Sequence, residues 1–189
     1  MPDDASCGKG GDVRIPEGAE RIASPEEVAA AFDRLAGDIS ARLAGREPVL
    51  VAVLEGGRMP ANEISRRLGI SHVNDTLRVG RYGRGATGGE LRWQAVPETP
   101  LAGRSVLVVD DILDEGVTLA AVANHCREAG AEEVLTCVLT VKDLPDRAAR
   151  FSPDFVGLLV PDRYIVGCGM DYQGRWRELP GLYALEEPL

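Results

Sequence analysis

A cluster of carboxylates follows a run of apolar residues near the middle of the chain. Residues 105–118 read Ser-Val-Leu-Val-Val-Asp-Asp-Ile-Leu-Asp-Glu-Gly-Val-Thr, with acids at Asp110, Asp111 and Asp114. When a buried strand ends in this way, ligands bind beyond the carboxyl end of the sheet, where the amides of the next helix can hold a phosphate. Asp110 and Asp111 can accept hydrogen bonds from vicinal hydroxyls. The residue types therefore indicate a site for a phosphorylated sugar.

A simpler interpretation is that these acids only cap the next helix. Capping accounts for Asp114 but not for the adjacent pair Asp110 and Asp111. Clustered like charges repel, and they usually need a cation or a hydroxyl-rich ligand for compensation. The pair therefore favours a ligand site.

The elements that must position these acids alternate along the chain. A capping box at Ser24 starts a helix, and the apolar strand 48–54 ends in Glu55-Gly56-Gly57. Helices are predicted over about 60–68 and 118–129, and strands over about 72–82, 90–96 and 133–141. This order predicts an α/β fold with a mostly parallel central sheet flanked by helices. Residues 153–189 break the rhythm and predict a small C-terminal hood over the sheet.

Length and composition exclude several classes of protein. With 189 residues, 44% of them hydrophobic, the chain predicts one domain over 20–189 after a flexible tail, residues 1–19. A net charge of −9 argues against a nucleic-acid partner, and no apolar stretch suggests a membrane span. The four cysteines lack C-x-x-C spacing; they could pair, but Cys126 and Cys137 fit buried free thiols in a reducing cytoplasm.

Residues 108–118 resemble the phosphoribosyl-pyrophosphate (PRPP) motif of type I phosphoribosyltransferases. Further matches are similar to the hypoxanthine-guanine branch of that family and occur in its order: residues 53–57, Arg81-Tyr82, Val141-Lys142 before Pro145, and residues 153–157 and 161–172. The resemblance spans roughly residues 49–179. It implies the fold of that family.

For PRPP, the resemblance implies that Asp110 and Asp111 bind the ribose hydroxyls. The amides of the loop 115–118 and the Thr118 hydroxyl would hold the 5′-phosphate. The remaining implied PRPP contacts are Glu55, Gly56, Arg81, Tyr82, Glu115, Gly116, Val117 and Arg177.

For the base, the resemblance implies that Asp114 is the catalytic residue, donating or accepting a proton near purine N7. Lys142 would donate to O6 of a 6-oxopurine, Tyr164 would stack on the ring, and the Ile165 backbone would bind the base edge, with Asp171 nearby. Asp171, Asp110 and Asp111 are the implied Mg²⁺ ligands, which suits the preference of Mg²⁺ for oxygen. A lysine at the end of a buried strand can also be a snorkelling side chain.

The implied activity is purine salvage: transfer of the phosphoribosyl group of PRPP to hypoxanthine or guanine, giving IMP or GMP and pyrophosphate. The resemblance also implies a homodimer or homotetramer. Two positions depart from the usual family pattern, because Glu55 and Glu115 are acidic beside expected phosphates; we expect Glu115 to point outward. These two acids support the alternative of a non-catalytic PRPP or nucleotide sensor. A transferase that prefers xanthine or uracil is a second alternative.

The glycine-rich segment 83–89 contains a formal G-x-G-x-x-G pattern. A strand rather than a helix is predicted after it, which argues against a dinucleotide fingerprint. It is predicted to be either a mobile lid over the reacting centre, with Arg81 and Tyr82 at its base, or an ordinary hairpin loop.

Overall fold

The computed structural model describes residues 15–82, 90–144 and 151–186. Most of the predicted tail (1–14) and the predicted lid (83–89) lie outside the described residues. The elements are β1 (Glu20–Ala23), α1 (Pro25–Arg42), β2 (Val49–Leu54), α2 (Arg58–Ser65), β3 (Val73–Tyr82), β4 (Glu90–Ala95), β5 (Ser105–Leu113), α3 (Val117–Glu128), β6 (Glu133–Lys142), β7 (Phe155–Val160), β8 (Tyr164–Val166) and β9 (Leu182–Leu185). Each predicted helix and strand is present close to its predicted position.

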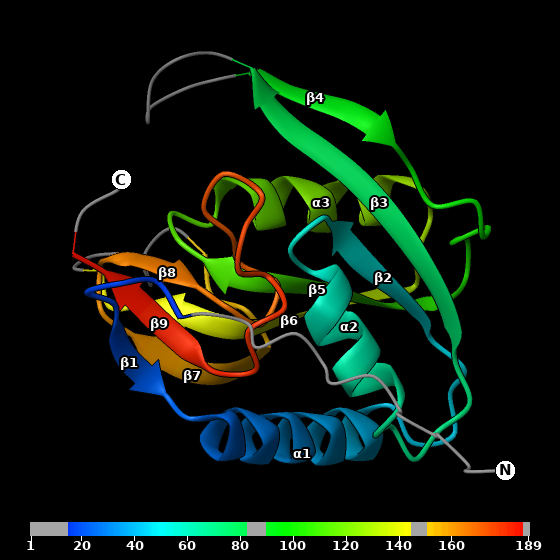
Figure 1. The fold of residues 1–189 in the computed structure, drawn as a ribbon. Coiled ribbons are helices and arrows are strands. Elements are labelled where there is room, and N and C mark those ends of the chain that lie inside the picture. The colour runs from blue at the N-terminus through cyan, green and yellow to red at the C-terminus, as the bar shows by residue number, and fades with distance from the viewer. Residues whose placement is uncertain (1–14, 83–89, 145–150, 187–189) are drawn as a thin grey trace, which may run out of the picture.

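The central sheet has the strand order β4-β3-β2-β5-β6-β7. Neighbouring strands from β3 to β7 pair in parallel, and only β4 at one edge runs antiparallel, against β3. The strand order reverses between β2 and β5, so the loops that follow these two strands diverge to opposite sides and leave a crevice between them. Figure 1 shows the sheet with its helices and the hood at one end. The predicted fold class is confirmed.

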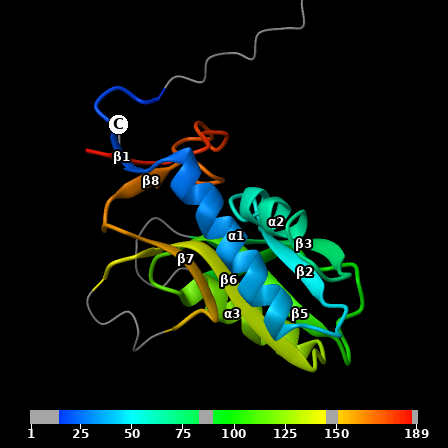
Figure 2. The ribbon, with the colours of Figure 1, turned by 90° about the horizontal axis from the view of Figure 1, so that it is seen from below.

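Two apolar layers hold the sheet between the helices. Alternate residues of β2 face opposite ways: Leu50 packs with α1 and α2, whereas Val51 packs with α3. Figure 2 shows α1 lying across the sheet on one side, with α3 beyond it. Burial on both faces explains the unbroken apolar runs of these strands. Cys126 and Cys137 lie in this core as free thiols, as predicted. No helix in the described parts of the chain is long and apolar enough to cross a membrane.

The hood differs from the predicted one at both ends of the chain. β7 pairs in parallel with β6 and is the edge strand of the central sheet, so residues 155–160 do not belong to the hood. The hood sheet has the order β1-β9-β8, all antiparallel, and therefore includes an N-terminal strand. β1 has only four residues, too few to show a periodicity, and its partner β9 lies at the other end of the sequence. The sequence therefore did not predict this strand.

The edge strand β7 is held closely against β6. A Cβ added at Gly157 would overlap the carbonyl oxygen of Leu139 on β6. From the helix side, the Arg34 guanidinium donates to the carbonyl oxygens of Val156 at 3.1 Å and Gly157 at 2.5 Å. The outer edge of the sheet is thus tied to α1, which fixes the strand that leads into the hood.

We expect Gly157→Ala to lower the free energy of unfolding by about 1–3 kcal/mol, the usual range for forcing an extra group into a packed site. The matched control is Gly37→Ala on α1, where an added Cβ meets nothing within 4 Å. That change should raise the free energy of unfolding by roughly 0.5–1 kcal/mol, because alanine is the better helix former. Urea denaturation measures both variants. Equal stability of Gly157→Ala and the unchanged protein would contradict the close packing of β7.

Candidate functional site

The adjacent acids Asp110 and Asp111 lie inside β5 rather than in a turn after it. β5 continues to pair with β6 as far as Leu113, so the strand is longer than its apolar core suggested. The Asp110 carboxylate accepts from the Asp111 amide at 2.9 Å, and the Asp111 carboxylate accepts from the Ile112 amide at 2.8 Å. The acids are therefore held in place by the backbone of their own strand.

Both of these carboxylates are difficult to ionise. Burial, and next the charge of Asp111, raise the pKa of Asp110 well above its ordinary value. Burial also raises the pKa of Asp111, although hydrogen bonds and the nearby Arg177 act in the opposite direction. A ligand that brings hydroxyl donors or positive charge would relieve this cost. The pair is thus suited to a hydroxyl-rich or cation-bound ligand.

The loop after β2 meets the last part of β5 at the point where the strand order reverses. A side chain at Gly56 would overlap the Asp111 carboxylate, so the glycine leaves the room that this acid occupies. A side chain at Gly169 of the hood would likewise overlap the carbonyl oxygen of Gly56. Three segments far apart in the sequence therefore touch at one corner of the sheet edge.

The predicted phosphate loop lies at the start of α3. Gly116 takes the cap position with φ of 83°, in the left-handed region that favours glycine, and no described side chain caps the helix there. The amides of Val117 and Thr118 thus stand in the first turn of a helix, an arrangement that favours an anion. Glu115 is half-buried, and its outward direction stays a prediction.

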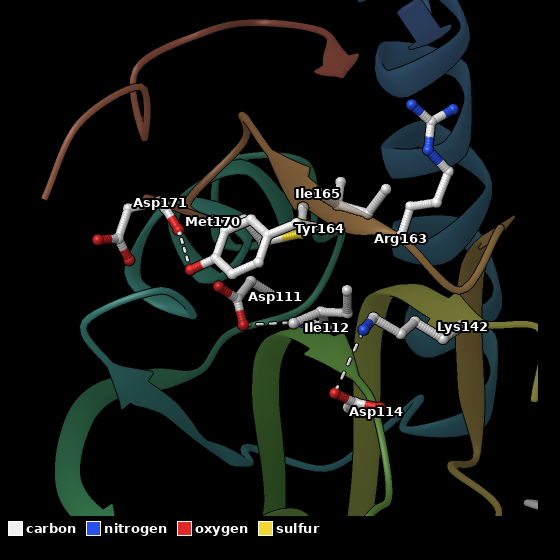
Figure 3. Close-up of a pocket in the computed structure, with 9 residues that line it drawn as sticks. All are labelled: Asp111, Ile112, Asp114, Lys142, Arg163, Tyr164, Ile165, Met170 and Asp171. Atoms are coloured by element: carbon white, nitrogen blue, oxygen red, sulfur yellow. Dashed lines mark hydrogen bonds and ion pairs between the residues drawn. The ribbon is translucent and has the colours of Figure 1, made fainter. Parts of the chain in front are cut away.

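A cavity of about 230 Å³ lies between the sheet edge and the hood (Figure 3). Six predicted site residues line it together: Asp111, Asp114, Lys142, Tyr164, Ile165 and Asp171. Ile112, Arg163 and Met170 complete the lining and were not predicted. Figure 3 shows Tyr164 and Ile165 on the hood side, and Asp114 and Lys142 on the sheet side. The cavity therefore offers an apolar face and a charged face to one ligand.

Lys142 brings the positive charge to the sheet side of this cavity. Its side chain is only 16% exposed, and its Nζ lies 3.3 Å from Asp114 Oδ2 and 3.3 Å from Asp162 Oδ1. A snorkelling lysine would carry its ammonium to solvent, whereas this one is held between two carboxylates. Asp162 was not predicted as a site residue.

Tyr164 forms part of the opposite wall. Its hydroxyl donates to the backbone carbonyl of Asp171 at 3.0 Å, and its ring meets the Tyr172 ring edge-on at 5.3 Å between centroids. Burial, and then the nearby Asp171 charge, raise the pKa of Tyr164, so the phenol is neutral and can donate. The side chain remains 41% exposed, which leaves a ring surface open for stacking.

Asp171 and Arg177 bind each other on the hood. Asp171 Oδ1 lies 2.5 Å from the Arg177 guanidinium, and Asp171 Oδ2 accepts from the Gly174 amide at 2.6 Å. Arg177 also donates to the Gly169 carbonyl at 2.5 Å. Among residues 15–82, 90–144 and 151–186, no three His, Cys, Asp or Glu side chains come together to hold a metal ion. The predicted ligand set Asp110, Asp111 and Asp171 is therefore not a single cluster, because Asp171 is turned to Arg177.

The acidic residue in the loop after β2 has basic partners. The peptide between Leu54 and Glu55 is cis. The Glu55 carboxylate pairs with Arg58 at 3.1 Å and also with Arg78 of β3. The two arginines therefore outweigh the charge of this glutamate. Arg81 and Tyr82 end β3, but their side chains lie outside the description.

The sequence could not have indicated Arg78 or Asp162 by local pattern. Each lies on a strand or turn whose spatial neighbours are set by the order of strands in the sheet. Arg163 and Met170 are next to predicted site residues in the sequence, which places them near the site. The sequence did not indicate that they line the cavity.

Residues 18–173 match the phosphoribosyl transferase domain family. The hypoxanthine phosphoribosyltransferase of Escherichia coli strain K12 is 31% identical over 173 residues, covering 89% of this chain and 92% of that protein. A bifunctional TilS/HprT protein of Listeria innocua is 30% identical over 161 residues. That alignment covers 84% of this chain, which spans only 24% of the longer protein.

Among solved structures, the hypoxanthine phosphoribosyltransferase of Trypanosoma cruzi in complex with the product IMP aligns with a TM-score of 0.80 at 26% identity. The alignment covers 91% of this chain and 97% of that one. The likeness extends over the central sheet and the hood together. The chain belongs to the phosphoribosyltransferase family, with the hypoxanthine-guanine members as its relatives.

Proposed function

We propose that this protein transfers the 5-phosphoribosyl group of PRPP to hypoxanthine or guanine, giving IMP or GMP and pyrophosphate in purine salvage. The observation that carries the proposal is the cavity in which Asp114 and Lys142 face the Tyr164 ring, beside the acids Asp110 and Asp111. A flat base with a 6-oxo group suits the aromatic wall and the ammonium. A ribose suits the paired acids.

In the proposed reaction, a ring nitrogen of the base attacks the anomeric carbon while the bond to pyrophosphate breaks. Positive charge develops on the ribose ring, and negative charge develops on the leaving group. Asp114 accepts the proton that the base loses from N7, within reach of the Lys142 ammonium, 3.3 Å away. The amides at the start of α3 hold the 5′-phosphate and so fix the ribose for attack.

The leaving pyrophosphate requires positive charge, which the arginines of the site supply. Arg177 beside Asp171 and the pair Arg58 and Arg78 beside Glu55 are the described candidates. Mg²⁺, held by Asp171 together with oxygens of PRPP, would neutralise the diphosphate, because Mg²⁺ commonly combines a carboxylate with substrate phosphates. Cytoplasmic location and assembly as a homodimer or homotetramer are part of the proposal and rest on the family resemblance.

The deciding experiment incubates the purified protein with Mg²⁺ and PRPP and with one base at a time: hypoxanthine, guanine, xanthine, uracil or adenine. Nucleotide and pyrophosphate are measured together. We expect IMP from hypoxanthine or GMP from guanine, with one pyrophosphate formed for each nucleotide. Product only from xanthine or uracil would replace the proposed substrate, and no nucleotide from any base would leave a PRPP or nucleotide sensor as the function.

Asp114→Asn should lower kcat for hypoxanthine by about 100-fold or more, the usual contribution of a positioned proton acceptor. The KM for PRPP should change little, because the proposed role concerns the base and not the phosphates. Steady-state kinetics in both substrates measure the two effects separately. Asp143→Asn is the control, since Asp143 is an exposed acid next to Lys142. Wild-type turnover by Asp114→Asn would remove the proton role.

Asp110→Asn should stabilise the ligand-free protein at neutral pH while it weakens PRPP binding. The folded-state pKa of Asp110 is raised, so its buried charge costs stability above the unfolded pKa. This cost fades as the pH falls through the folded pKa, because the acid then becomes neutral like asparagine. Urea denaturation over a descending pH series, with calorimetric titration of PRPP, measures both effects. A stability gain that persists unchanged at acidic pH would contradict the assignment.

A further inference from the structure

Three neighbouring strands of the central sheet end in a row of charged side chains. β5, β6 and β7 are adjacent, and their register pairs Leu113 with Val141 and Lys142 with Val160. Asp114 directly follows β5, Lys142 is the last residue of β6, and Asp162 lies two residues after β7. Parallel strands bring these ends to the same edge, so the order there is acid, base, acid.

The outer acid of this row is held in a fixed turn. The Asp143 amide donates to the Val160 carbonyl at 2.8 Å, and the Arg163 amide donates to the Pro161 carbonyl at 2.8 Å. The Arg163 guanidinium pairs with Glu20 of β1. The backbone on both sides of Asp162 is therefore anchored, to the sheet before it and to the hood after it.

The Lys142 ammonium lies at the same distance from the two acids. Nζ of Lys142 is 3.3 Å from one oxygen of each carboxylate. The side chains of Asp114 and Asp162 are 56% and 58% exposed, whereas that of Lys142 is 16% exposed. The cation is therefore largely buried, and its two partners lie nearer to solvent. Lys142 donates a hydrogen bond to Asp114 and forms an ion pair with Asp162. An ammonium has three N–H donors, so it can also donate to a ligand in the cavity that Lys142 lines.

We propose that Asp162 is a positioning residue that balances the pull of Asp114 on the Lys142 ammonium and so leaves a donor aimed at the 6-oxo group of the base. The inference rests on the proposed function. Without Asp162, Lys142 would pair more closely with Asp114. That pairing would take up the donor for O6, so the contact to the 6-oxo group would weaken.

This role gives a choice between bases. An oxygen at position 6 accepts from the aimed ammonium, whereas an amino group at position 6 presents its own hydrogens to it. IMP and AMP differ in this substituent and in the ring protonation that accompanies it, so they are the natural probes. An ion pair that served only to stabilise the turn would affect the two nucleotides alike.

The test compares Asp162→Ala and Asp162→Asn with the unchanged protein, with calorimetric titration of IMP and of AMP. For Asp162→Ala we expect IMP affinity to fall by about tenfold, in the range of one charge-assisted hydrogen bond, and AMP affinity to stay the same. Asp162→Asn keeps a neutral acceptor and should show a smaller loss. Asp162→Glu, which restores the charge, should recover part of the affinity, and Asp143→Asn is the matched control.

A double-variant cycle gives the sharper readout. In a Lys142→Met background, removal of the Asp162 carboxylate should change IMP affinity no further, because the group that it positions is absent. Thermal unfolding of each variant reports whether the fold is kept; if Asp162→Ala unfolds, Asp162→Asn carries the comparison.

Equal losses for IMP and AMP, or a full loss that persists without Lys142, would overturn the inference while turnover by the unchanged protein upholds the proposed function. Unchanged IMP affinity in both Asp162→Ala and Asp162→Asn would overturn it in the same way. Failure of the unchanged protein to form any nucleotide would overturn both.

Discussion

The parallel register of β2, β5, β6 and β7 is the constraint on which the rest of the site depends. Parallel pairing sends every strand end to one edge of the sheet, and the reversal of order between β2 and β5 opens a crevice there. Residues of very different sequence position thus become neighbours: Gly56 after β2, Asp111 in β5, Lys142 at the end of β6 and Asp162 after β7. Adjacent residues of a strand face opposite ways, so a shift of one residue in β5 would exchange the faces to which Asp110 and Asp111 point.

The chemical cost of this arrangement is an excess of carboxylates at one edge. Asp110 and Asp111 have raised pKa values because they are buried and adjacent, and no described cation pairs with them at ion-pair distance. By contrast, Glu55, Asp114, Asp162 and Asp171 all have a basic partner. Of these acids, the adjacent pair in β5 is therefore the one whose charge is least compensated by the described residues. A ligand that brings hydroxyl donors or positive charge would relieve this electrostatic cost.

Local patterns predicted much of this fold and part of its site. The capping box at Ser24, the apolar runs and the acids after Val109 act within a few residues of one another, and so they can be read from the chain. The hood boundary could not be read in that way. β1 depends on β9, and β7 on β6, through pairings between distant segments, and no helical periodicity before β7 indicated a parallel crossover. Arg78 and Asp162 were missed for the same reason, since their roles follow from which strands are neighbours.

The hood has a sheet of its own, and a series of contacts joins it to the edge of the central sheet. Tyr164 donates to the backbone of Asp171, Asp171 pairs with Arg177, and Arg177 donates to the carbonyl of Gly169, which packs on Gly56. Gly56 in turn leaves room for Asp111. This chain of contacts joins the aromatic wall of the cavity to the paired acids of β5. The links are backbone groups and the partly exposed side chains of Tyr164, Asp171 and Arg177. The cavity wall that carries Tyr164 and the corner where Gly56 and Asp111 meet thus belong to one connected set of contacts.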